Sequence, residues 1–543
     1  MKLPTALEMR NLDHSASKVF GIPSVVLMEN AGLGTVNIIE QKIGPCRDSF
    51  ALIFIGPGNN GGDGLVIGRH LHQRGCQPIF FFLVNPDSLQ GDTAINLNII
   101  RKLRLPFHVI DNSARVETIP ILFKQLETRG LPCYAIIDAI FGIGLGREVT
   151  GHFADTIRLI NQTDFAVQSP VIAVDIPSGI NADTGKILGT CVRANHTVTY
   201  CCAKPGHFIH DSTSCIGALE ILDIGIPPEV ITEAEIKNHL ITPSTFKATS
   251  RFFNRKKSSH KGDHGHVLII AGAKGKTGAA ILATKGALRS GAGLVSLCAP
   301  QELNTIFEIS LPEAMTIPLP NSLGTLSNSD WNIIKKNLKE KQAVVVGPGI
   351  GVTQQTEKLL LRLYGTVECP LIIDADGLNI IAKNREKLPK PAGPRIFTPH
   401  PGELSRLLNI PVEKIQNHRL EAATTACNLF ADKRHESILV LKGSGTIIAS
   451  TDGTTSINTS GNPGMASGGM GDVLSGIIGA LAGLGMSPLD AARTGVYLHG
   501  CAADILFKKC GVGFNASEVS KNIPAAIKEH LNHASSFDKQ HTI

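Results

Sequence analysis

The sequence of 543 residues contains few aromatic and few charged residues. With only one tryptophan and four tyrosines, the chain is expected to have an aliphatic core. Charged residues make up 18% of the chain, and the net charge of +6 is spread without a basic stripe interleaved with aromatic residues. This pattern argues against a nucleic-acid groove, so we expect no nucleic-acid partner.

Long apolar runs and paired cysteines are also missing. The longest apolar stretch, Val473 to Gly485, is broken by glycines and falls short of the ~20 residues that span a bilayer. Glu8 and Asp13 precede any apolar run, so no signal peptide is expected. The 12 cysteines include no C-x-x-C pair, which excludes a zinc knuckle or a disulfide framework. These absences predict a cytoplasmic protein with no membrane partner.

Glycine and aliphatic residues, in contrast, are abundant. Apolar residues make up 43% of the chain, with 55 glycines and 30 prolines, a composition typical of loop-rich α/β enzymes. The length exceeds what one hydrophobic core usually supports. Ile226-Pro227-Pro228-Glu229 breaks the chain before a polar stretch. We therefore predict a first domain over residues 1–228, a linker over 229–260, a second domain over 261–530 and a tail over 531–543.

Short β-branched runs alternate with helical patterns in both predicted domains, which predicts parallel sheets covered by helices. The predicted strands include 51–55, 78–84, 135–137, 171–174 and 219–224 in the first domain, and 267–271, 343–346, 371–373 and 438–441 in the second. The predicted fold class is therefore α/β for both domains.

A glycine-rich turn follows the first of these strands. Gly58-Asn59-Asn60-Gly61-Gly62-Asp63-Gly64 leads into a helix predicted from Leu65. Glycines let backbone N–H groups approach a phosphate, and the helix that follows directs its positive end at the anion. The G-x-G-x-x-G spacing of a dinucleotide-binding Rossmann domain is missing. The turn is a candidate phosphate site, and a purely structural turn is the alternative.

Two aspartates end neighbouring strands of the same domain. Asp138 follows strand 135–137 and precedes a second glycine-rich loop, and Asp175 follows strand 171–174. Ligands in open α/β sheets bind at the carboxyl ends of the strands, so both side chains should point into the crevice of the first turn. Helix capping or turn formation is the alternative for each aspartate.

These segments, together with 9–13, 27–32, 204–206 and 223–227, resemble the YjeF N-terminal family, the epimerases of hydrated nicotinamide cofactors. The resemblance implies a Rossmann-like three-layer sandwich, with a potassium ion held by Asn60, Asp138 and Ser178. It also implies that Asp175 contacts the hydrated ring, and Asp175 is our candidate for the acid–base group that inverts the hydroxyl-bearing carbon. The implied dinucleotide contacts are Asn59, Asn60, Gly61, Gly62, Asp63, Gly142, Ile143, Gly144, Leu145, Gly146, Arg147 and Glu148.

The strongest motif of the second domain is Gly468-Gly469-Met470-Gly471-Asp472, before the last long helix that we predict, which ends near Leu484. Such a turn can hold negative charge that develops on a phosphoryl group, while Asp472 takes the proton from an attacking hydroxyl. A simple helix cap is the alternative. Gly275-Lys276-Thr277 lacks the spacing of a Walker motif, so Lys276 is interpreted as a solvated loop residue.

Three further segments of this domain follow predicted strands, namely 374–379, 398–403 and 442–446. Surface turns explain each of them alone. Their joint position opposite Asp472 favours a cleft with the substrate on one side and a nucleotide on the other.

With 278–280, 291–295 and 346–351, these segments resemble the ribokinase-like dehydratase of hydrated NADH and NADPH. The resemblance implies a ribokinase-like α/β domain in which the hydrate contacts Ala279, Gly351, His400 and Asp472. The implied nucleotide contacts are Lys442, Gly443, Ser444, Gly445, Thr446 and Gly471. The implied reaction phosphorylates the ring hydroxyl and then eliminates phosphate. ADP, giving AMP and phosphate, is the expected co-substrate with ATP as the alternative, and magnesium is expected to neutralise phosphoryl charge.

Together the two resemblances predict a metabolite-repair enzyme, expected to be a homo-oligomer. Its first domain would equilibrate the R and S hydrates of NADH and NADPH, and its second would dehydrate the S form. One alternative is a small-molecule kinase acting on a vitamin precursor or sugar, which leaves the first domain idle. Another is a non-enzymatic scaffold like the related domain of messenger-RNA decapping proteins, which need not keep Asn60, Asp138, Asp175 and Ser178 together.

Overall fold

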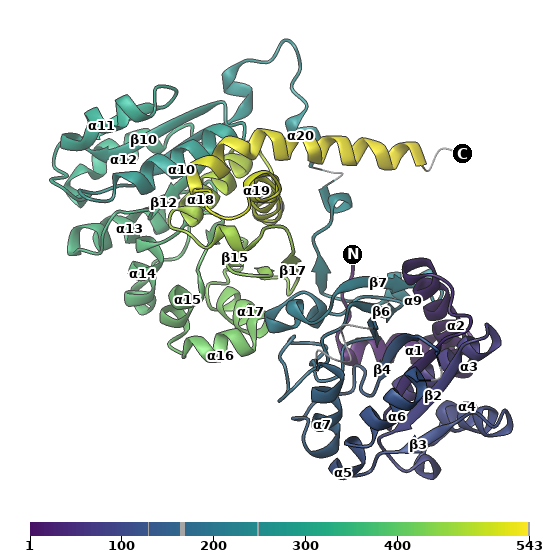
Figure 1. The fold of residues 1–543 in the computed structure, drawn as a ribbon. Helices are drawn as coiled ribbons and strands as arrows, with labels where there is room; N and C mark the ends of the chain where they lie inside the picture. Colours follow the sequence, from purple (N-terminus) through teal and green to yellow (C-terminus); the bar gives the residue numbers. More distant parts are fainter. Residues whose placement is uncertain (129, 163–168, 247–248, 541–543) are drawn as a thin grey trace. The chain divides into compact units, whose positions relative to one another are not determined.

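The computed structural model of the protein describes residues 1–128, 130–162, 169–246 and 249–540. The chain forms two compact units, the first over Lys2–Asn238 and the second from His239 onwards. This division lies within the predicted linker. Each unit is built around its own β-sheet (Figure 1).

A parallel seven-stranded sheet forms the centre of the first unit, in the order β3-β2-β1-β4-β5-β6-β7. Its strands are β1 (Phe50–Ile55), β2 (Gln77–Phe82), β3 (Phe107–Val109), β4 (Cys133–Ala139), β5 (Val171–Val174), β6 (His196–Tyr200) and β7 (Ala218–Leu222). Every residue of β1 is buried, as expected for a central parallel strand covered on both faces. The order of the strands reverses between β1 and β4, and such a reversal opens a crevice at the carboxyl ends of these strands.

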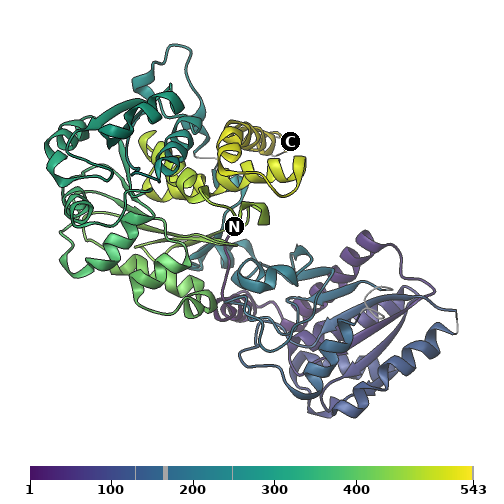
Figure 2. The same cartoon turned by 60° about the vertical axis from the view of Figure 1, so that its left-hand side comes forward.

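Helices cover both faces of this sheet (Figures 1 and 2). They are α1 (Ala6–Lys18), α2 (Ser24–Ile43), α3 (Asn59–Gln73), α4 (Gly91–Lys102), α5 (Ser113–Val116), α6 (Ile119–Glu127), α7 (Gly151–Ile160) and α9 (Pro228–Glu233). On one face, Ile53 of β1 shares a buried cluster with Leu65 of α3. On the other face, Phe54 of β1 shares a separate cluster with Phe123 of α6. The expected three-layer sandwich is therefore confirmed.

The second unit contains a ten-stranded sheet in the order β11-β10-β9-β12-β13-β14-β15-β16-β17-β8. Its strands are β8 (Asn238–Leu240), β9 (His266–Ile270), β10 (Leu294–Pro300), β11 (Met315–Leu319), β12 (Ala343–Val346), β13 (Leu371–Ile373), β14 (Arg395–Phe397), β15 (Ser437–Leu441), β16 (Thr446–Ser450) and β17 (Thr455–Asn458). From β11 to β15 neighbouring strands are parallel, and β16 and β17 continue the sheet with antiparallel pairing. The order reverses between β9 and β12, which places a second crevice there.

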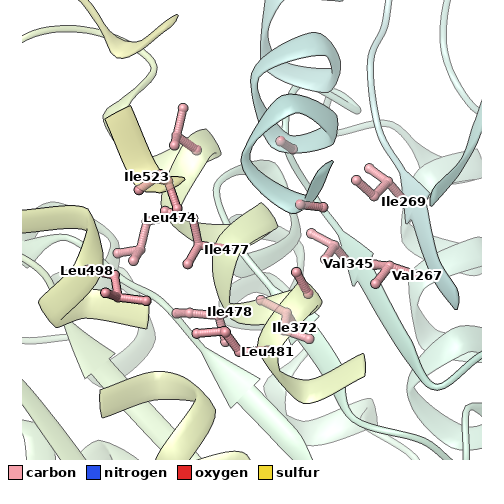
Figure 3. Close-up of a cluster of buried hydrophobic side chains, with 14 of the residues drawn as sticks. Val267, Ile269, Val345, Ile372, Leu474, Ile477, Ile478, Leu481, Leu498 and Ile523 are labelled. Atoms are coloured by element: carbon pink, nitrogen blue, oxygen red, sulfur yellow. The ribbon is translucent and has the colours of Figure 1, made fainter. Parts of the chain in front are cut away.

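A buried helix, α18, lies against this sheet. The helices of the unit are α10 (Thr277–Arg289), α11 (Asn304–Ser310), α12 (Trp331–Leu338), α13 (Gln354–Thr366), α14 (Asp376–Lys383), α15 (Pro401–Leu408), α16 (Val412–Asn417), α17 (Arg419–Leu429), α18 (Met470–Gly483), α19 (Pro488–Cys510) and α20 (Ala516–Gln540). Figure 3 shows Ile477 of α18 in one apolar cluster with Val345 of β12. A Cβ added at Gly476 would lie 1.9 Å from the carbonyl oxygen of Ala283, so glycine at this position allows α18 to approach α10 closely.

Some helix boundaries differ from the prediction. α3 begins at Asn59 rather than at Leu65. Its first turns contain glycines that lie against Met28 and Ala139, where any side chain would collide, so the helical backbone fits there. α19 and α20 follow α18, so α18 is not the last long helix, and α20 continues through the predicted tail as far as Gln540. Within the described ranges, no helix combines the length and apolar character needed to cross a membrane.

Candidate active sites

A cavity of about 650 Å³ lies at the strand reversal of the first sheet. It is lined by residues that follow β1, β4, β5 and β6, and by residues of α1 and α2. Its volume is in the range typical of cofactor and substrate sites. The structure thus brings the predicted residues Asn59, Asn60, Asp63 and Asp175 to one cavity.

Asp175, directly after β5, is held in one orientation by its neighbours. Its φ of 65° lies in the left-handed region, which is strained for an aspartate and occurs often at functional sites. Its Oδ1 accepts hydrogen bonds from Lys204 Nζ at 2.5 Å and from Thr199 Oγ1 at 2.9 Å. His207 Nδ1 accepts the backbone N–H of Lys204 at 3.0 Å, so His207 Nε2 carries a proton and donates it to the Asp175 carbonyl oxygen at 3.1 Å.

Three of the carboxyl groups that line this cavity differ in pKa. Burial alone would raise the pKa of Asp175, but Lys204, His207 and Thr199 together outweigh burial and hold that pKa below its ordinary value. Burial, with the negative charges of Asp175 and Asp13, raises the pKa of Asp63 well above its ordinary range. Burial also raises the pKa of Asp13 to about 6, although Lys204 opposes the shift. Asp175 therefore ionises at a lower pH than an ordinary aspartate, whereas Asp63 keeps its proton to a higher pH.

A second polar cluster lies where β4 ends. Asp138 is fully buried and accepts hydrogen bonds from Ser178 Oγ at 2.5 Å and from the Ser178 backbone N–H at 2.8 Å. Burial raises the pKa of Asp138 to about 6. The buried amide of Asn60 has no hydrogen-bond partner among the described residues. It lies against Gly142, in the loop after Asp138, where an added Cβ would come within 3.3 Å of Asn60 Oδ1.

Such an unpaired buried amide is costly unless a ligand satisfies it. Carboxylate, amide and hydroxyl oxygens are donors that suit a hard cation. The donor set of Asn60, Asp138 and Ser178 therefore fits the ion that the resemblance implies.

The predicted dinucleotide contacts fall into two groups. All of the residues from Gly142 to Arg147 line the cavity, whereas Gly61, Gly62 and Glu148 are not among the lining residues. A Cβ added at Gly144 or Gly146 would meet no atom nearby, so bare backbone borders open space there. At Gly61 an added Cβ would lie 2.5 Å from the Gly56 carbonyl oxygen, so the absence of a side chain serves the packing of α3.

Lys204 is a site residue that the predicted constellation omits. Its side chain is 1% exposed and forms an ion pair with Asp175. Burying an ammonium is costly without such a partner. The available signal was Lys204-Pro205-Gly206 after a β-branched strand, because the carboxyl end of that strand shares a sheet edge with Asp175.

A second cavity, of about 440 Å³, lies at the strand reversal of the second sheet. Its lining residues follow β9, β12, β13 and β14 or begin α18, and they are Gly275, Lys276, Gly278, Ala279, Gly349, Ala375, Asp376, Asn379, His400, Glu403, Arg406 and Asp472. The predicted hydrate contacts Ala279, His400 and Asp472 are thus brought together. Gly351 lies beside them, since its backbone N–H donates to Asp376 Oδ2 at 2.9 Å.

Asp472 stands in the first turn of α18, close to a buried charge cluster. Lys442 Nζ lies 2.8 Å from Asp374 Oδ1 and 3.8 Å from Glu403 Oε2. Burial and the charge of Asp374 raise the pKa of Asp472 to about 6. A Cβ added at Gly471 would lie 3.0 Å from Lys442 Nζ, so glycine there leaves room for the ammonium. Near neutral pH Asp472 is a carboxylate that can accept a proton.

His400 presents a neutral imidazole to the same cavity. Its Nδ1 accepts the backbone N–H of Gly402 at 3.0 Å, while Glu403 Oε2 accepts the backbone N–H of His400 at 2.8 Å. Burial lowers the pKa of His400, and the cations Lys442 and Arg406 lower it further. Because Nδ1 is an acceptor, the proton of the neutral ring is on Nε2, which can donate a hydrogen bond.

Lys276 is an exposed loop residue, as predicted, but it also has a position that the prediction did not include. Its side chain is 51% exposed, but Nζ lies 2.9 Å from Asp376 Oδ2 and the residue lines the cavity. The motif spacing excluded a Walker loop without excluding a cavity position. Lys276 is therefore a cation at the rim of the site.

The predicted nucleotide segment forms the turn between β15 and β16. Gly443 and Gly445 have φ values of 137° and 61°, which only glycine adopts readily. The backbone N–H of Lys442 donates to the carbonyl oxygen of Pro399 at 2.9 Å, which ties this turn to the loop before His400. Lys442 and Gly471 meet at the carboxylate cluster, but neither they nor residues 443–446 are among the residues that line the cavity.

Known families match both units of this chain. Residues 24–206 match the family described as YjeF-related protein N-terminus, and residues 267–525 match the family described as NAD(P)H-hydrate dehydratase. The bifunctional NAD(P)H-hydrate repair enzyme Nnr of Moorella thermoacetica is 40% identical over 508 residues, covering 93% of this chain and 92% of that protein. The Escherichia coli protein of the same name is 32% identical over 548 residues, covering 98% and 94% respectively.

A solved structure also resembles the second unit. It is the ADP/ATP-dependent NAD(P)H-hydrate dehydratase from Bacillus subtilis, co-crystallised with ATP/Mg2+. It is 31% identical, covers 54% of this chain and 98% of its own, and gives a TM-score of 0.46.

Proposed function

This chain belongs to the family of bifunctional NAD(P)H-hydrate repair enzymes, and from that premise we propose that its two units carry out successive steps of one repair. The first unit interconverts the R and S hydrates of NADH and NADPH. The second unit dehydrates the S form with a nucleotide as co-substrate. The observation that carries this proposal is that each unit places an aspartate, the buried Asp175 or the partly buried Asp472, in a cavity at its own strand reversal.

In the first unit, Asp175 is the acid–base group at the hydrated ring. The carboxylate is kept ionised and oriented by Lys204 and Thr199. The open backbone of Gly144 and Gly146 borders the dinucleotide, together with Asn59, where phosphates can accept backbone N–H groups. A positioned acid–base group contributes roughly a hundred- to ten-thousand-fold to the rate.

A potassium ion held by Asn60, Asp138 and Ser178 is part of this proposal. When bound, the ion supplies positive charge beside the phosphate-binding backbone. We expect potassium chloride to raise the thermal unfolding temperature of the wild-type protein relative to choline chloride at equal ionic strength. This difference should disappear in Asn60→Ala, and an unchanged difference in that variant would count against the assigned ligands.

In the second unit, Asp472 accepts the proton of the ring hydroxyl. The hydroxyl oxygen then attacks the terminal phosphoryl group of the nucleotide, whose bond to the leaving phosphate oxygen breaks. Loss of inorganic phosphate and a ring proton restores the double bond of the nicotinamide ring. Backbone N–H groups at the start of α18 and the ammonium of Lys442 oppose the negative charge of the transferring group. ADP would yield AMP and phosphate, and ATP would yield ADP and phosphate.

Magnesium fits this site as a partner of the nucleotide. Magnesium usually binds through one or two carboxylates together with substrate phosphates. Asp374 and Glu403, which lie beside Lys442, are carboxylates that can bind the ion. The described part of the chain contains no group of three metal-ligating side chains that would form a site without the nucleotide. When bound, the ion neutralises phosphate charge.

We further place the enzyme in the reducing cytoplasm as a homo-oligomer. The 12 cysteines, all present as free thiols, support this location.

The test of the whole proposal is an absorbance assay at the reduced-nicotinamide band. Mixed R and S hydrates are given to the wild-type protein with ADP or ATP in turn. Complete recovery of absorbance is expected with one of these nucleotides. Accumulation of a stable phosphorylated product without recovery would instead identify a small-molecule kinase, and failure to convert either epimer would refute the repair function.

A further inference from the structure

We propose that Asp63 is a second catalytic acid–base group of the first unit, acting on the face of the hydrated ring opposite to Asp175. This inference rests on the proposed epimerase function and adds a chemical role to a residue that the resemblance implies only as a dinucleotide contact.

Three carboxyl groups of the cavity lie around one buried ammonium. Asp13 of α1, Asp63 of α3 and Asp175 after β5 all line it, together with Lys204. Asp63 is 8% exposed. Lys204 Nζ donates to Asp175 Oδ1 at 2.5 Å, to Thr199 Oγ1 at 2.8 Å and to the Tyr200 carbonyl oxygen at 3.3 Å. These three contacts use the three hydrogens of the ammonium.

Asp63 is therefore left without a paired cation among the described residues. The other ionisable groups of the lining are Arg10, Asp92, Arg147 and Tyr200. The Tyr200 hydroxyl lies 3.1 Å from Thr35 Oγ1, and burial and Asp63 both raise its pKa. Two buried carboxylates, Asp63 and Asp175, together with the partly buried Asp13, are unfavourable beside one ammonium, so one of these groups keeps a proton. Asp63 is the most deeply buried carboxyl group without a partner, and the pKa directions agree with this assignment.

The backbone around Asp63 is fixed by close packing. A Cβ added at Gly62 would lie 2.6 Å from Met28 Cε, and one added at Gly64 would lie 2.6 Å from Ala139 Cβ. The second turn of α3 therefore has little freedom to move. A proton donor on a rigid helix facing the cavity can be positioned accurately against a bound ring.

The reaction itself needs proton transfer on two faces of the ring. Water adds to the enamine of a dihydronicotinamide so that the hydroxyl is on the carbon next to the ring nitrogen. When Asp63 protonates that hydroxyl, the carbon–oxygen bond breaks, water leaves with the bonding electrons, and the nitrogen lone pair forms a carbon–nitrogen double bond. A water on the opposite face then attacks the same carbon and gives its proton to Asp175. The reverse direction exchanges the two roles. Between turnovers Asp175 releases its proton to solvent, and solvent restores the proton on Asp63.

Two carboxyl groups with divergent proton affinities are the pattern expected for such a pair. Asp175 can receive a proton at neutral pH because Lys204 keeps it ionised. A single carboxylate on one face cannot both release the old hydroxyl and activate the new water on the other face. The geometry therefore assigns the acid role to Asp63.

The test compares Asp63→Asn with Asp63→Glu in the full chain. Asparagine keeps the shape of the side chain and removes its acidic proton, so the epimerisation kcat should fall by roughly a hundred- to ten-thousand-fold while KM stays nearly constant. Glutamate restores a protonated carboxyl group and should recover part of the rate. Asp87→Asn, at an exposed residue of the same unit that pairs with Arg101, is the charge-matched control and should epimerise normally.

A spectroscopic readout separates catalysis from a structural role. Infrared difference spectra should show the carbonyl band of a protonated carboxylic acid in the wild-type protein at neutral pH, and Asp63→Asn should lose it. Dehydration of pure S hydrate by each variant reports that the second unit is folded, and the rate recovered by Asp63→Glu reports that the first unit tolerates substitution at this position.

The outcomes distinguish this inference from the proposed function. A wild-type protein that does not epimerise would end the epimerase function itself. A wild-type protein that epimerises, alongside an Asp63→Asn variant of equal rate or an unchanged infrared band, would overturn the role of Asp63 alone. Retention of the original hydroxyl oxygen during inversion in ¹⁸O-labelled water would overturn it as well.

Discussion

In the first unit Asp175 lies beside the ammonium of Lys204, whereas in the second unit Asp472 lies near the carboxylates of Asp374 and Asp376. Both residues occupy the carboxyl edge of a sheet at a strand reversal. Lys204 holds the pKa of Asp175 below its ordinary value in spite of burial. Burial and neighbouring negative charge raise the pKa of Asp472 to about 6. Cavities at the strand reversals of two α/β sheets can therefore contain aspartates whose pKa values shift in opposite directions.

The two glycine-rich turns differ in a similar way. The glycines of α3 mostly allow the helix to pack against its neighbours, and the open backbone of the first cavity is supplied by the loop after β4. At the start of α18, Gly471 instead makes room for the ammonium of Lys442. Similar sequence patterns thus serve packing in one unit and the arrangement of charge in the other.

The largest effect is expected from a substitution that inactivates the second site alone. Asp472→Asn should lower the rate of S-hydrate dehydration by roughly a hundred- to ten-thousand-fold, because no base remains to take the hydroxyl proton. Epimerisation should be unchanged. Asp490→Asn is the matched control, since Asp490 also lies in the first turn of a helix, α19. Equal losses in both variants, measured by recovery of nicotinamide absorbance, would favour the simple capping role of Asp472.

A smaller effect is expected from removing the cation of the first site. Lys204→Met keeps an unbranched side chain but leaves Asp175 buried without its partner, which typically costs about 3–5 kcal/mol of unfolding free energy. Epimerisation should fall as well, because Asp175 would hold its proton. Urea unfolding measures the first effect. Lys42→Met breaks the exposed pair with Glu220 and should cost no more than about 1 kcal/mol, so equal costs would contradict the account of Lys204.

The smallest expected effect is a difference in pH dependence between the reactions of the two aspartates. A base must be ionised, so dehydration kcat/KM should rise as the pH increases through about 6, the pKa of Asp472, and then level off. The corresponding rise in the rate of epimerisation, which depends on Asp175, should lie at lower pH, since the pKa of Asp175 is below the ordinary value of an aspartate. Stopped assays of each half-reaction across this range measure both limbs. Coincident limbs would mean that the surroundings of the two residues do not differ as described.

Much of the fold follows from local patterns. Buried parallel strands such as β1 and β12 are continuous apolar runs, and β5 and β12 have the predicted boundaries. Asp138 and Asp175 could be placed at one sheet edge because Asp138 stands near the end of such a strand, β4, and Asp175 follows another, β5. The same rule applied to Lys204 would have found it, but lysine is so common on surfaces that its burial is visible only once Asp175 is in place.

Other features depend on tertiary contacts that no local pattern contains. The start of α3 at Asn59 depends on how closely the helix approaches Met28 and Ala139, whereas the glycines alone predict a loop in this segment. Lys276 becomes a cavity residue only because Asp376, a hundred residues further along, lies beside it. The role of Lys442 likewise depends on a carboxylate from another strand, Asp374.

The central claim is that one chain contains two separable active sites, and an assay of Asp175→Ala on mixed hydrates tests it most directly. With ADP or ATP present, the wild-type protein should restore the absorbance of both epimers. The variant should restore only the absorbance that comes from the S form, and it should do so at the wild-type rate. Further recovery should then be limited to the rate of spontaneous epimerisation. Complete recovery by Asp175→Ala at the wild-type rate would contradict the account.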